Sequence, residues 1–522
     1  MSPDSAANAA QQIAAGYIAD GQALELGTVV IDGAADSSAQ VRIPLATINR
    51  HGLVAGATGT GKTKTLQVIA EQLSAAGVPV LMADVKGDLS GLSRAGEAGD
   101  KTAQRAADTG DDWVPTAFPV EFLSLGTGGL GVPVRATISS FGPILLSKVL
   151  GLNATQESTL GLIFHWADQN GYLLLDLKDL RSVITFLTSD AGKPQLKNLG
   201  GVSAQTAGVI LRALVNLEAE GGDTFFGEPE LKPEDLLRTD SQGRGIITLL
   251  ELGDQAARPV LFSTFLMWVL ADLFTLLPEV GDVDKPKLVF FFDEAHLLFA
   301  DASKAFLQQV EQTVKLIRSK GVGVFFCTQL PTDVPNTVLS QLGARVQHAL
   351  RAFTPDDQKA LSKTVRTYPK TDVYDLESAL TSLGIGEAIV TVLSEKGAPT
   401  PVAWTRLRAP RSLMASIGDQ AITAAATASS LHAAYSETVD RESAYEILSG
   451  KLASGEGSAP PSDAQGYDEV PPAPKLHWWT RLGRWIKGLF ASPAAKSFAR
   501  SAGTAMGREI TRGMMGTGRR RR

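Results

Sequence analysis

The chain alternates between short apolar runs and longer stretches of helical periodicity. Residues 52–55 form one such apolar run, and a glycine-rich turn follows it. A helix-like stretch then covers residues 62–76, Gly77 ends it, and residues 78–83 form a second apolar run. A strand, a helix and a second strand in this order predict a parallel βαβ unit.

Apolar runs of the same kind return further along the chain, and helix-like stretches separate the first three of them. They cover residues 245–252, 287–292, 322–327 and 345–350. Two weaker runs near the N-terminus, 28–31 and 40–43, read as short strands. The pattern predicts an α/β fold with a twisted, mainly parallel sheet and helices on both faces of it.

Residues 91–240 have a different and mostly helical pattern. Four stretches there look helical, at 139–150, 156–170, 177–188 and 204–220. We interpret the region as a large helical insertion in the core. It would separate residues 1–90, with the N-terminal strands and the first part of the core, from residues 241–410, which complete it.

The C-terminal part of the chain divides into three predicted segments. Residues 411–453 form an Ala-rich helical extension, and residues 454–474 have the Pro, Gly, Ser and acidic composition of a disordered linker. The tail, residues 475–522, contains twelve Lys and Arg residues against a single acidic residue, Glu509.

Within this tail, apolar side chains follow the spacing of one helix face. They are Trp478, Leu482, Trp485, Ile486, Leu489 and Phe490. A basic amphipathic helix of this type suits peripheral contact with a membrane surface or docking on a partner protein. The pattern leaves both readings open.

The segment from Pro259 to Pro278 is nearly all apolar and about as long as a bilayer requires. Asp272 interrupts it, and it lies between two predicted strands. The sequence therefore favours a buried crossover helix over a membrane span.

Composition narrows the class of protein. A formal net charge of −6 argues against a uniformly basic surface, so any DNA contact has to come from a local patch or an oligomeric channel. Cys327 is the only cysteine, which excludes an intrachain disulfide. The first 22 residues lack the basic start and apolar core of a signal peptide, so a cytoplasmic location is expected.

A glycine-rich segment carries the first chemical motif. It consists of Gly56, Ala57, Thr58, Gly59, Thr60, Gly61, Lys62 and Thr63, and it matches the Walker A spacing between a strand and a helix. Glycines let the backbone N–H groups and the helix N-terminus wrap a phosphate closely. Lys62 would reach the β- and γ-phosphates of ATP, and the Thr63 hydroxyl would bind Mg²⁺.

The apolar run at 288–292 ends in two carboxylates, Asp293 and Glu294, which is the Walker B pattern. Asp293 would hold Mg²⁺, and Glu294 would polarise the attacking water. His296 follows, and a packing or supporting role for it is at least as well indicated as a direct one.

Two further strand ends carry polar side chains. Gln329 follows the run at 322–327, and ligands of parallel sheets bind at the carboxyl ends of strands. Gln329 would therefore lie near Glu294, where it could sense the γ-phosphate or orient the water; hydrogen bonding to a neighbouring loop is the alternative. Asp84 ends the second strand on the same edge and would either contribute to the site or cap the turn.

Taken together, the segments GATGTGKT, ADVKGDLSG, FFFDEAH, CTQLP and GARVQHALRAFTPDDQKAL resemble the HerA–FtsK class of P-loop ATPases. More narrowly, the chain resembles the bacterial HerA-like branch of YjgR type, over residues 15–410 and in its basic tail. Two departures concern a reduced N-terminal β-barrel and the large helical insertion.

The resemblance implies a RecA-like core that binds ATP and Mg²⁺, assembles into a homo-hexameric ring and takes double-stranded DNA as its usual cargo. It also implies an arginine that reaches the γ-phosphate of the neighbouring subunit. Arg345 and Arg351 lie in the matching region, and Arg351 is our first choice. A rival hypothesis is an ATP-dependent assembly or switch protein that does not act on DNA and is held at the inner membrane surface by its tail.

Overall fold

The computed structural model describes residues 3–454, apart from 85–86, 197–199, 252–258, 282 and 301. Beyond residue 454, the predicted linker and the basic tail lie outside the described residues. All described residues belong to one compact unit, Met1–Ala459.

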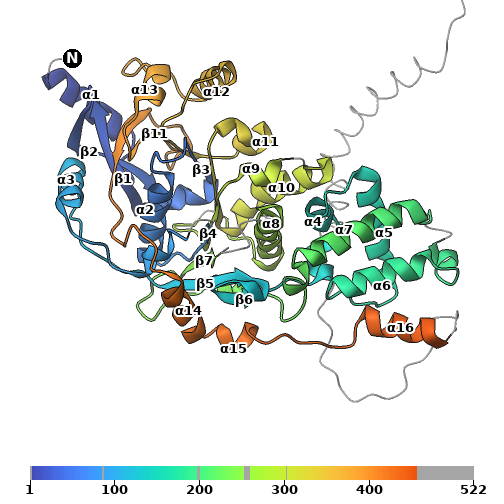
Figure 1. Cartoon of the computed structure of the whole chain (residues 1–522). Coiled ribbons are helices and arrows are strands. Elements are labelled where there is room, and N and C mark those ends of the chain that lie inside the picture. Colours follow the sequence, from blue (N-terminus) through green and yellow to red (C-terminus); the bar gives the residue numbers. More distant parts are fainter. Residues whose placement is uncertain are drawn as a thin grey trace, which may run out of the picture. The chain divides into compact units, whose positions relative to one another are not determined.

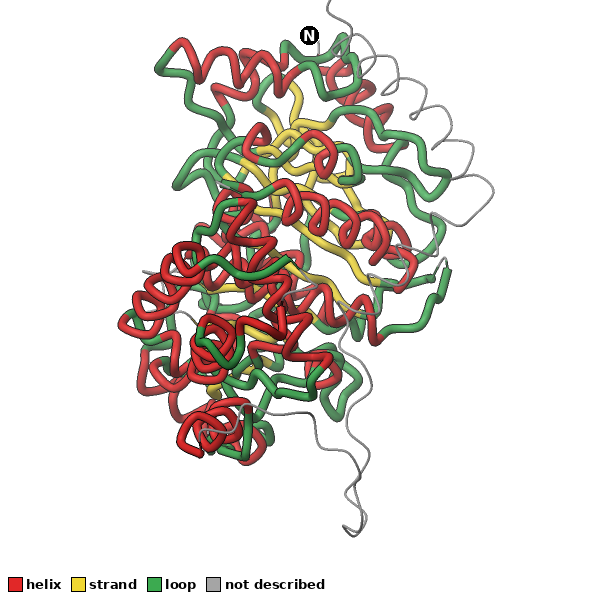
Figure 2. Tube along the Cα trace, turned by 90° about the vertical axis from the view of Figure 1, so that its right-hand side faces the viewer, coloured by secondary structure: helices red, strands yellow, loops and turns green. Residues whose placement is uncertain are grey.

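One large sheet runs through this unit, and Figure 2 shows its strands as a single layer with helices packed around it. The strand order in the described residues is β2-β1-β12-β11-β10-β3-β9-β8-β4-β7-β5-β6. The strands are β1 (Ala23–Ile31), β2 (Ala34–Pro44), β3 (Gly52–Ala55), β4 (Val80–Asp84), β5 (Val120–Leu125), β6 (Val132–Val134), β7 (Ile247–Glu251), β8 (Leu288–Phe292), β9 (Val322–Thr328), β10 (Ala344–Gln347), β11 (Glu387–Thr391) and β12 (Ala403–Leu407).

In this spatial order, the neighbouring strands from β10 through β3 and on to β6 are parallel to one another. On the other side of β10, the neighbours through β11, β12 and β1 to β2 pair antiparallel. The predicted α/β fold with a mainly parallel sheet is confirmed. The two N-terminal strands are longer than their apolar runs indicate, because they form one hairpin. Its turn, Asp32-Gly33, has positive φ at both residues (48° and 80°), which the right-handed twist of a tight hairpin favours.

The central parallel strands are apolar throughout because both faces of the sheet are covered. Phe290, Phe291 and Phe292 of β8 are all buried, and the Phe292 ring stacks on Phe326 of β9 at 5.3 Å between centroids. Crossover helices connect these strands: α2 (Lys62–Ala75) joins β3 to β4, α8 (Pro259–Leu276) precedes β8, and α10 (Lys304–Ile317) precedes β9.

Helix α8 corresponds to the apolar segment that was weighed against a membrane span. It packs against α10 and α4 inside the protein, and its Trp268 is fully buried. In the described part of the chain, no helix combines the length and the apolar character that crossing a bilayer requires.

Residues 91–240 contain the four expected helices, gathered at one end of the unit beside α8 and α10 in Figure 1. They are α4 (Ile138–Val149), α5 (Ala154–Gln169), α6 (Leu177–Thr188) and α7 (Ala204–Ala219). The same stretch also supplies β5 and β6 to the sheet, so it is not separate from the core. The remaining helices before β12 are α1 (Pro3–Ala15), α3 (Asp100–Thr109), α9 (His296–Phe299), α11 (Asn336–Leu339), α12 (Pro355–Val365) and α13 (Leu376–Ser382).

After β12 the chain forms what we call the C-terminal arm, residues 408–454. It begins with irregular backbone and continues through α14 (Asp419–Ala428), α15 (His432–Tyr435) and α16 (Ala444–Ser454). Helix α14 contacts β5, α15 contacts β6 and α16 packs on α6, so the arm connects the sheet with the helical region, as Figure 1 shows.

Candidate nucleotide-binding site

The loop between β3 and α2 has a backbone that only glycine accommodates easily. Gly56 has φ of 150°, and a Cβ there would lie 2.5 Å from Cβ of His348. Gly61 has φ of 113° and caps the N-terminus of α2, which begins at Lys62. Because this N-terminus presents unpaired N–H groups and a positive dipole end, the loop fits a phosphate group.

Residues far away in the sequence hold this loop in place. The Ala57 amide donates to the Ala349 carbonyl (2.8 Å), and the Gly386 amide donates to the Thr60 carbonyl (3.1 Å). Buried beneath the loop, His348 has Nε2 2.9 Å from Oγ1 of Thr65 in α2. Burial lowers the pKa of His348 to about 4, and Lys62 adds to this shift, so the ring is neutral at pH 7.

Lys62 and Thr63 open helix α2 at the sheet's carboxyl edge. The Lys62 ammonium donates to the carbonyls of Gly56 (2.7 Å) and Ala57 (3.2 Å), so it lies over the loop rather than pointing into solvent. A cation in this place supplies the charge that bound phosphates require.

The two carboxylates of the Walker B pattern follow β8 directly. Oδ1 of Asp293 accepts a hydrogen bond from the Glu294 amide at 2.9 Å. Burial raises the pKa of Asp293, and the Glu294 carboxylate raises it further, while Lys62 opposes the shift. A carboxylate beside the P-loop lysine suits a hard cation such as Mg²⁺, which favours oxygen ligands.

Glu294 has an unusual backbone and an unpaired oxygen. Its φ is 47°, a conformation that costs a residue with a side chain and that is found most often at functional sites. Among the described residues, no hydrogen bond of proper geometry reaches Oε2, although Nδ1 of His296 lies 3.3 Å from it. Oε2 of Glu294 is thus buried without a hydrogen bond among the described residues, with the His296 ring at ion-pair distance.

The sheet order brings these groups to one edge. Strand β9 lies between β3 and β8, and all three are parallel, so the Walker A loop, Gln329 and Glu294 follow neighbouring strands at their carboxyl ends. Gln329 is exposed. The sequence reasoning assigned no site role to Cys327, which is buried in β9; its thiol hydrogen-bonds to Asp293. Burial raises the pKa of this thiol, and Asp293 contributes.

The two candidate arginines lie in different surroundings. Arg351 is exposed after β10, and its Nη2 donates to the Thr58 carbonyl of the loop at 3.4 Å. Arg345 lies within β10 and donates to the carbonyls of Thr367 (3.3 Å) and Leu339 (3.5 Å). Of these two arginines, Arg351 is the one that contacts the glycine-rich loop.

Two buried carboxyl groups end neighbouring strands on the same edge. Asp84 of β4 pairs in register with Glu251 of β7, and each has one oxygen that finds no hydrogen-bond partner among the residues that the structure describes. The other oxygen of Asp84 accepts from the amides of Leu89 (2.8 Å) and Ser90 (3.1 Å), so Asp84 caps the turn after β4. Burial raises the pKa of Asp84 to about 6 and that of Glu251 to about 8, with the repulsion of Asp84 as a second cause for Glu251.

The opposite side of α2 is held by the C-terminal arm. Glu71 of α2 accepts from the amides of Arg411 and Ser412 at 2.9 Å each, and Gln67 donates to the Leu413 carbonyl at 2.9 Å. Lys64, at the start of the helix, donates to the Met414 carbonyl at 3.0 Å. Because Lys64, Gln67 and Glu71 share one helix face, the arm lies along it.

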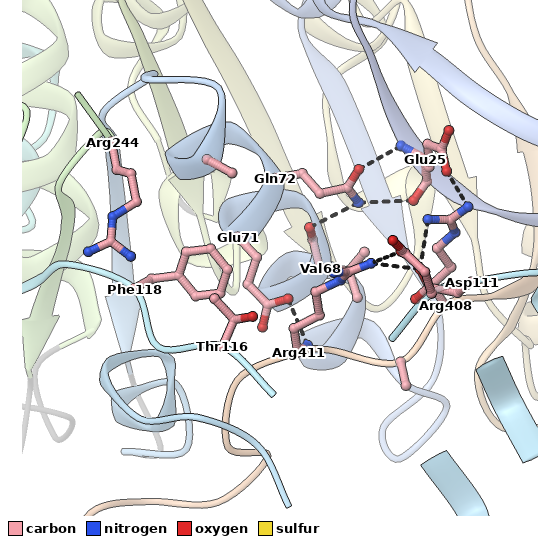
Figure 3. A pocket seen from close by; sticks show the side chains of 13 residues that line it. Glu25, Val68, Glu71, Gln72, Asp111, Thr116, Phe118, Arg244, Arg408 and Arg411 are labelled. Carbon is pink, nitrogen blue, oxygen red and sulfur yellow. Dashed lines mark hydrogen bonds and ion pairs between the residues drawn. The ribbon is translucent and has the colours of Figure 1, made fainter. Parts of the chain in front are cut away.

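Figure 3 shows the cavity of about 390 Å³ beside this contact. Two of its arginines pair with acidic side chains of the same cavity: Arg408 reaches Glu25 and Asp111, and Arg411 reaches Asp111 and Asp112. Because these charges have partners within the cavity wall, we interpret the cavity as part of the arm's anchorage.

The comparisons with known proteins agree with this geometry. The bacterial conjugative coupling protein TrwBdeltaN70, in its unbound form, shares 18% identity over 78% of this chain and 94% of its own, with a TM-score of 0.51. VirB4 of Thermoanaerobacter pseudethanolicus shares 16% identity over 75% of this chain and 98% of its own, with a TM-score of 0.47. At such identities the likeness to TrwB shows the fold alone, a RecA-like P-loop ATPase fold.

A search of curated proteins gives no match. By contrast, the family model described as "Helicase HerA-like C-terminal" matches residues 30–522, nearly the whole chain. The chain therefore belongs to the HerA-like helicase C-terminal family of P-loop ATPases.

Proposed function

We propose that the protein binds and hydrolyses ATP·Mg²⁺ and that it is a ring-forming, DNA-translocating motor of the HerA–FtsK type. The observation that carries the hydrolysis is the arrangement of Lys62, Asp293 and Glu294 at one edge of the sheet. Family membership supports the motor. TrwB, whose fold the chain shares, has been solved in complex with ADP and Mg²⁺.

In this proposal the loop amides and Lys62 hold the phosphates, while Thr63 and Asp293 hold the metal. When bound, Mg²⁺ would neutralise charge on the phosphate oxygens. Glu294 accepts a proton from the attacking water through its unpaired Oε2, and Gln329 orients that water from the neighbouring strand. These assignments follow the positioning and electrostatic logic of phosphoryl transfer.

Arg351 is proposed to act on the nucleotide of a neighbouring subunit in a homo-hexamer. Arg351 is exposed and donates to the Thr58 carbonyl of the loop, whereas Arg345 is half-buried and donates to the Thr367 and Leu339 carbonyls, which are not part of the loop. An interface ion pair is the alternative role for Arg351.

The decisive experiment is the ATP hydrolysis rate with and without duplex DNA, on protein whose oligomeric state has been measured by light scattering. We expect hydrolysis to require the oligomer and to rise with DNA. Hydrolysis that is indifferent to DNA would instead favour the assembly or switch protein.

The basic tail, residues 475–522, is the specific observation that favours this second candidate. Flotation with anionic liposomes of the intact chain, against a chain ending at Pro474, would test it. If both remain in the soluble fraction at low salt, the tail is a docking element for protein rather than a membrane contact.

A further inference from the structure

Two apolar side chains beside the glycine-rich loop face solvent. Phe353 is 84% exposed and Ile385 is 77% exposed, more than any other large apolar side chain in the described residues. Ligand pockets are lined mainly by apolar and aromatic side chains, so exposed apolar residues on segments that contact a ligand-binding loop are candidates for such a lining.

Both residues lie on short segments fixed to the loop. Phe353 follows Arg351, which contacts the Thr58 carbonyl. Ile385 precedes Gly386, whose amide donates to the Thr60 carbonyl, and a Cβ at Gly61 would lie 3.3 Å from that amide nitrogen. The segment of Ile385 thus lies in direct contact with the start of α2.

The two segments are also joined to each other. The Leu350 amide donates to the Leu380 carbonyl at 2.8 Å, and Leu350, Leu380 and Leu383 share one buried cluster. On the other side, Arg105 donates to the carbonyls of Ile385 (3.3 Å) and Gly386 (3.1 Å). The side chains of Phe353 and Ile385 are therefore exposed, although hydrogen bonds and a buried apolar cluster hold the backbone segments that carry them.

The sheet order gives the direction in which a bound nucleotide would extend. In the proposed function the terminal phosphate faces Asp293 and Glu294, which follow β8. Strand β9 separates β8 from β3, the strand that leads into the glycine-rich loop. The nucleoside then leaves the loop on the opposite side of β3, toward β10 and β11. Phe353 follows β10 and Ile385 precedes β11.

We propose that Phe353 and Ile385 form the subsite for the purine base of the nucleotide, with the Phe353 ring stacking on the base and Ile385 packing against it. A flat aromatic base offers a face that an exposed ring can cover with little loss of side-chain freedom. The inference rests on the proposed function, because it requires that the loop binds the phosphates of a nucleotide.

The test compares ATP with inorganic tripolyphosphate, which has the phosphates but no base. Calorimetry in the presence of Mg²⁺ gives both dissociation constants for the intact chain and for Phe353→Ala, Ile385→Ala and Phe353→Tyr. We expect Phe353→Ala to raise the dissociation constant of ATP on the order of 10-fold, as loss of base–aromatic stacking does. Ile385→Ala should have a smaller effect and Phe353→Tyr almost none.

Tripolyphosphate binding should stay unchanged in all three variants. The matched control is Val439→Ala, which truncates an exposed apolar side chain of the C-terminal arm, 55% exposed, and should leave both constants unchanged.

Each other result overturns the inference in a distinguishable way. If ATP and tripolyphosphate weaken equally, the two side chains support the loop and do not bind the base. If ATP binding is unchanged and light scattering shows a smaller assembly, they are subunit contacts. If the unaltered chain binds ATP no better than tripolyphosphate, the base subsite is wrong while the phosphate site stands. Binding of neither ligand would refute the proposed function itself.

Discussion

Helix α2 has two sides that are used in opposite ways. At its N-terminus, the Lys62 ammonium lies over the glycine-rich loop. On the same edge of the sheet, after β8, Oε2 of Glu294 has no hydrogen-bond partner among the described residues. Along its back, Glu71 and Gln67 are buried. Glu71 accepts hydrogen bonds from backbone amides of the C-terminal arm, and Gln67 donates one to a backbone carbonyl of the arm. In the proposed function Lys62 and Glu294 act on a substrate, whereas the hydrogen-bonded groups at the back stabilise the position of the helix.

This contrast has an experimental consequence. Substitutions at the front of α2 should alter nucleotide binding or turnover and leave the unfolding transition almost unchanged. Substitutions at its back should lower the unfolding transition and leave the activity of the folded protein almost unchanged. The following variants test whether effects on activity and effects on stability separate in this way.

Lys62→Ala should have the largest effect. It removes the only loop side chain that brings a positive charge to the β- and γ-phosphates, and loss of one such contact typically lowers turnover by about 10²–10³. We expect ATP hydrolysis near the detection limit and a melting temperature close to that of the unaltered protein. A large fall in melting temperature would instead show that the lysine stabilises the empty loop.

Glu294→Gln should separate binding from turnover. The amide keeps the shape of the side chain but cannot accept a proton, so hydrolysis should fall on the order of 10³ while ATP binding persists. Calorimetry and single-turnover hydrolysis give the two quantities. Near-normal hydrolysis would mean that another residue is the general base. His296→Ala should lower the hydrolysis rate much less than Glu294→Gln does.

Arg351→Ala tests the role across the subunit interface. If the guanidinium stabilises the transition state in a neighbouring subunit, hydrolysis should fall on the order of 10³. Mixing this variant with Glu294→Gln should restore part of the activity, because some mixed interfaces are intact on both sides. Full activity of an isolated monomer would contradict the assignment.

Glu71→Ala should act on stability. It leaves the buried amides of Arg411 and Ser412 without their acceptor, which costs about 1–3 kcal/mol of the free energy of unfolding. Urea denaturation measures this loss, and hydrolysis per folded molecule should stay near normal. The exposed Glu97→Ala is the matched control, since a surface substitution should change stability by less than about 0.5 kcal/mol.

The last prediction concerns the pH dependence of stability. Because the pKa of Glu251 is raised to about 8, the folded protein keeps a proton that the unfolded chain releases near its ordinary pKa. The free energy of unfolding should therefore fall as the pH rises from about 5 to 8. Glu251→Gln cannot ionise, so its free energy of unfolding should match that of the unaltered protein at pH 4.5 and exceed it at pH 8. An equal pH dependence in both proteins would show that Glu251 ionises normally.

Much of the molecule was determined by local sequence. The apolar runs predicted the central parallel strands because those strands are buried on both faces, and helical periodicity predicted α4 to α7 within a few residues. The Walker A spacing predicted a glycine-rich turn between a strand and a helix, and Gly56 and Gly61 of that turn have the positive φ that favours glycine. Strands β5 and β6 were not predicted; Pro133 interrupts the short run of β6, and only pairing with a neighbour makes such a run a strand.

Contacts between distant segments were decided only by the tertiary structure. The position of β9 between β3 and β8 puts the loop, Gln329 and Glu294 at the ends of neighbouring strands, and no local pattern predicts this order of strands. The contact of Arg351 with Thr58, and that of Gly386 with Thr60, join residues about 300 positions apart. Burial of Glu71 and Glu251 also depends on contacts between distant segments. The sequence shows only that each residue is charged, whereas the fold determines whether its carboxylate meets water or a backbone amide.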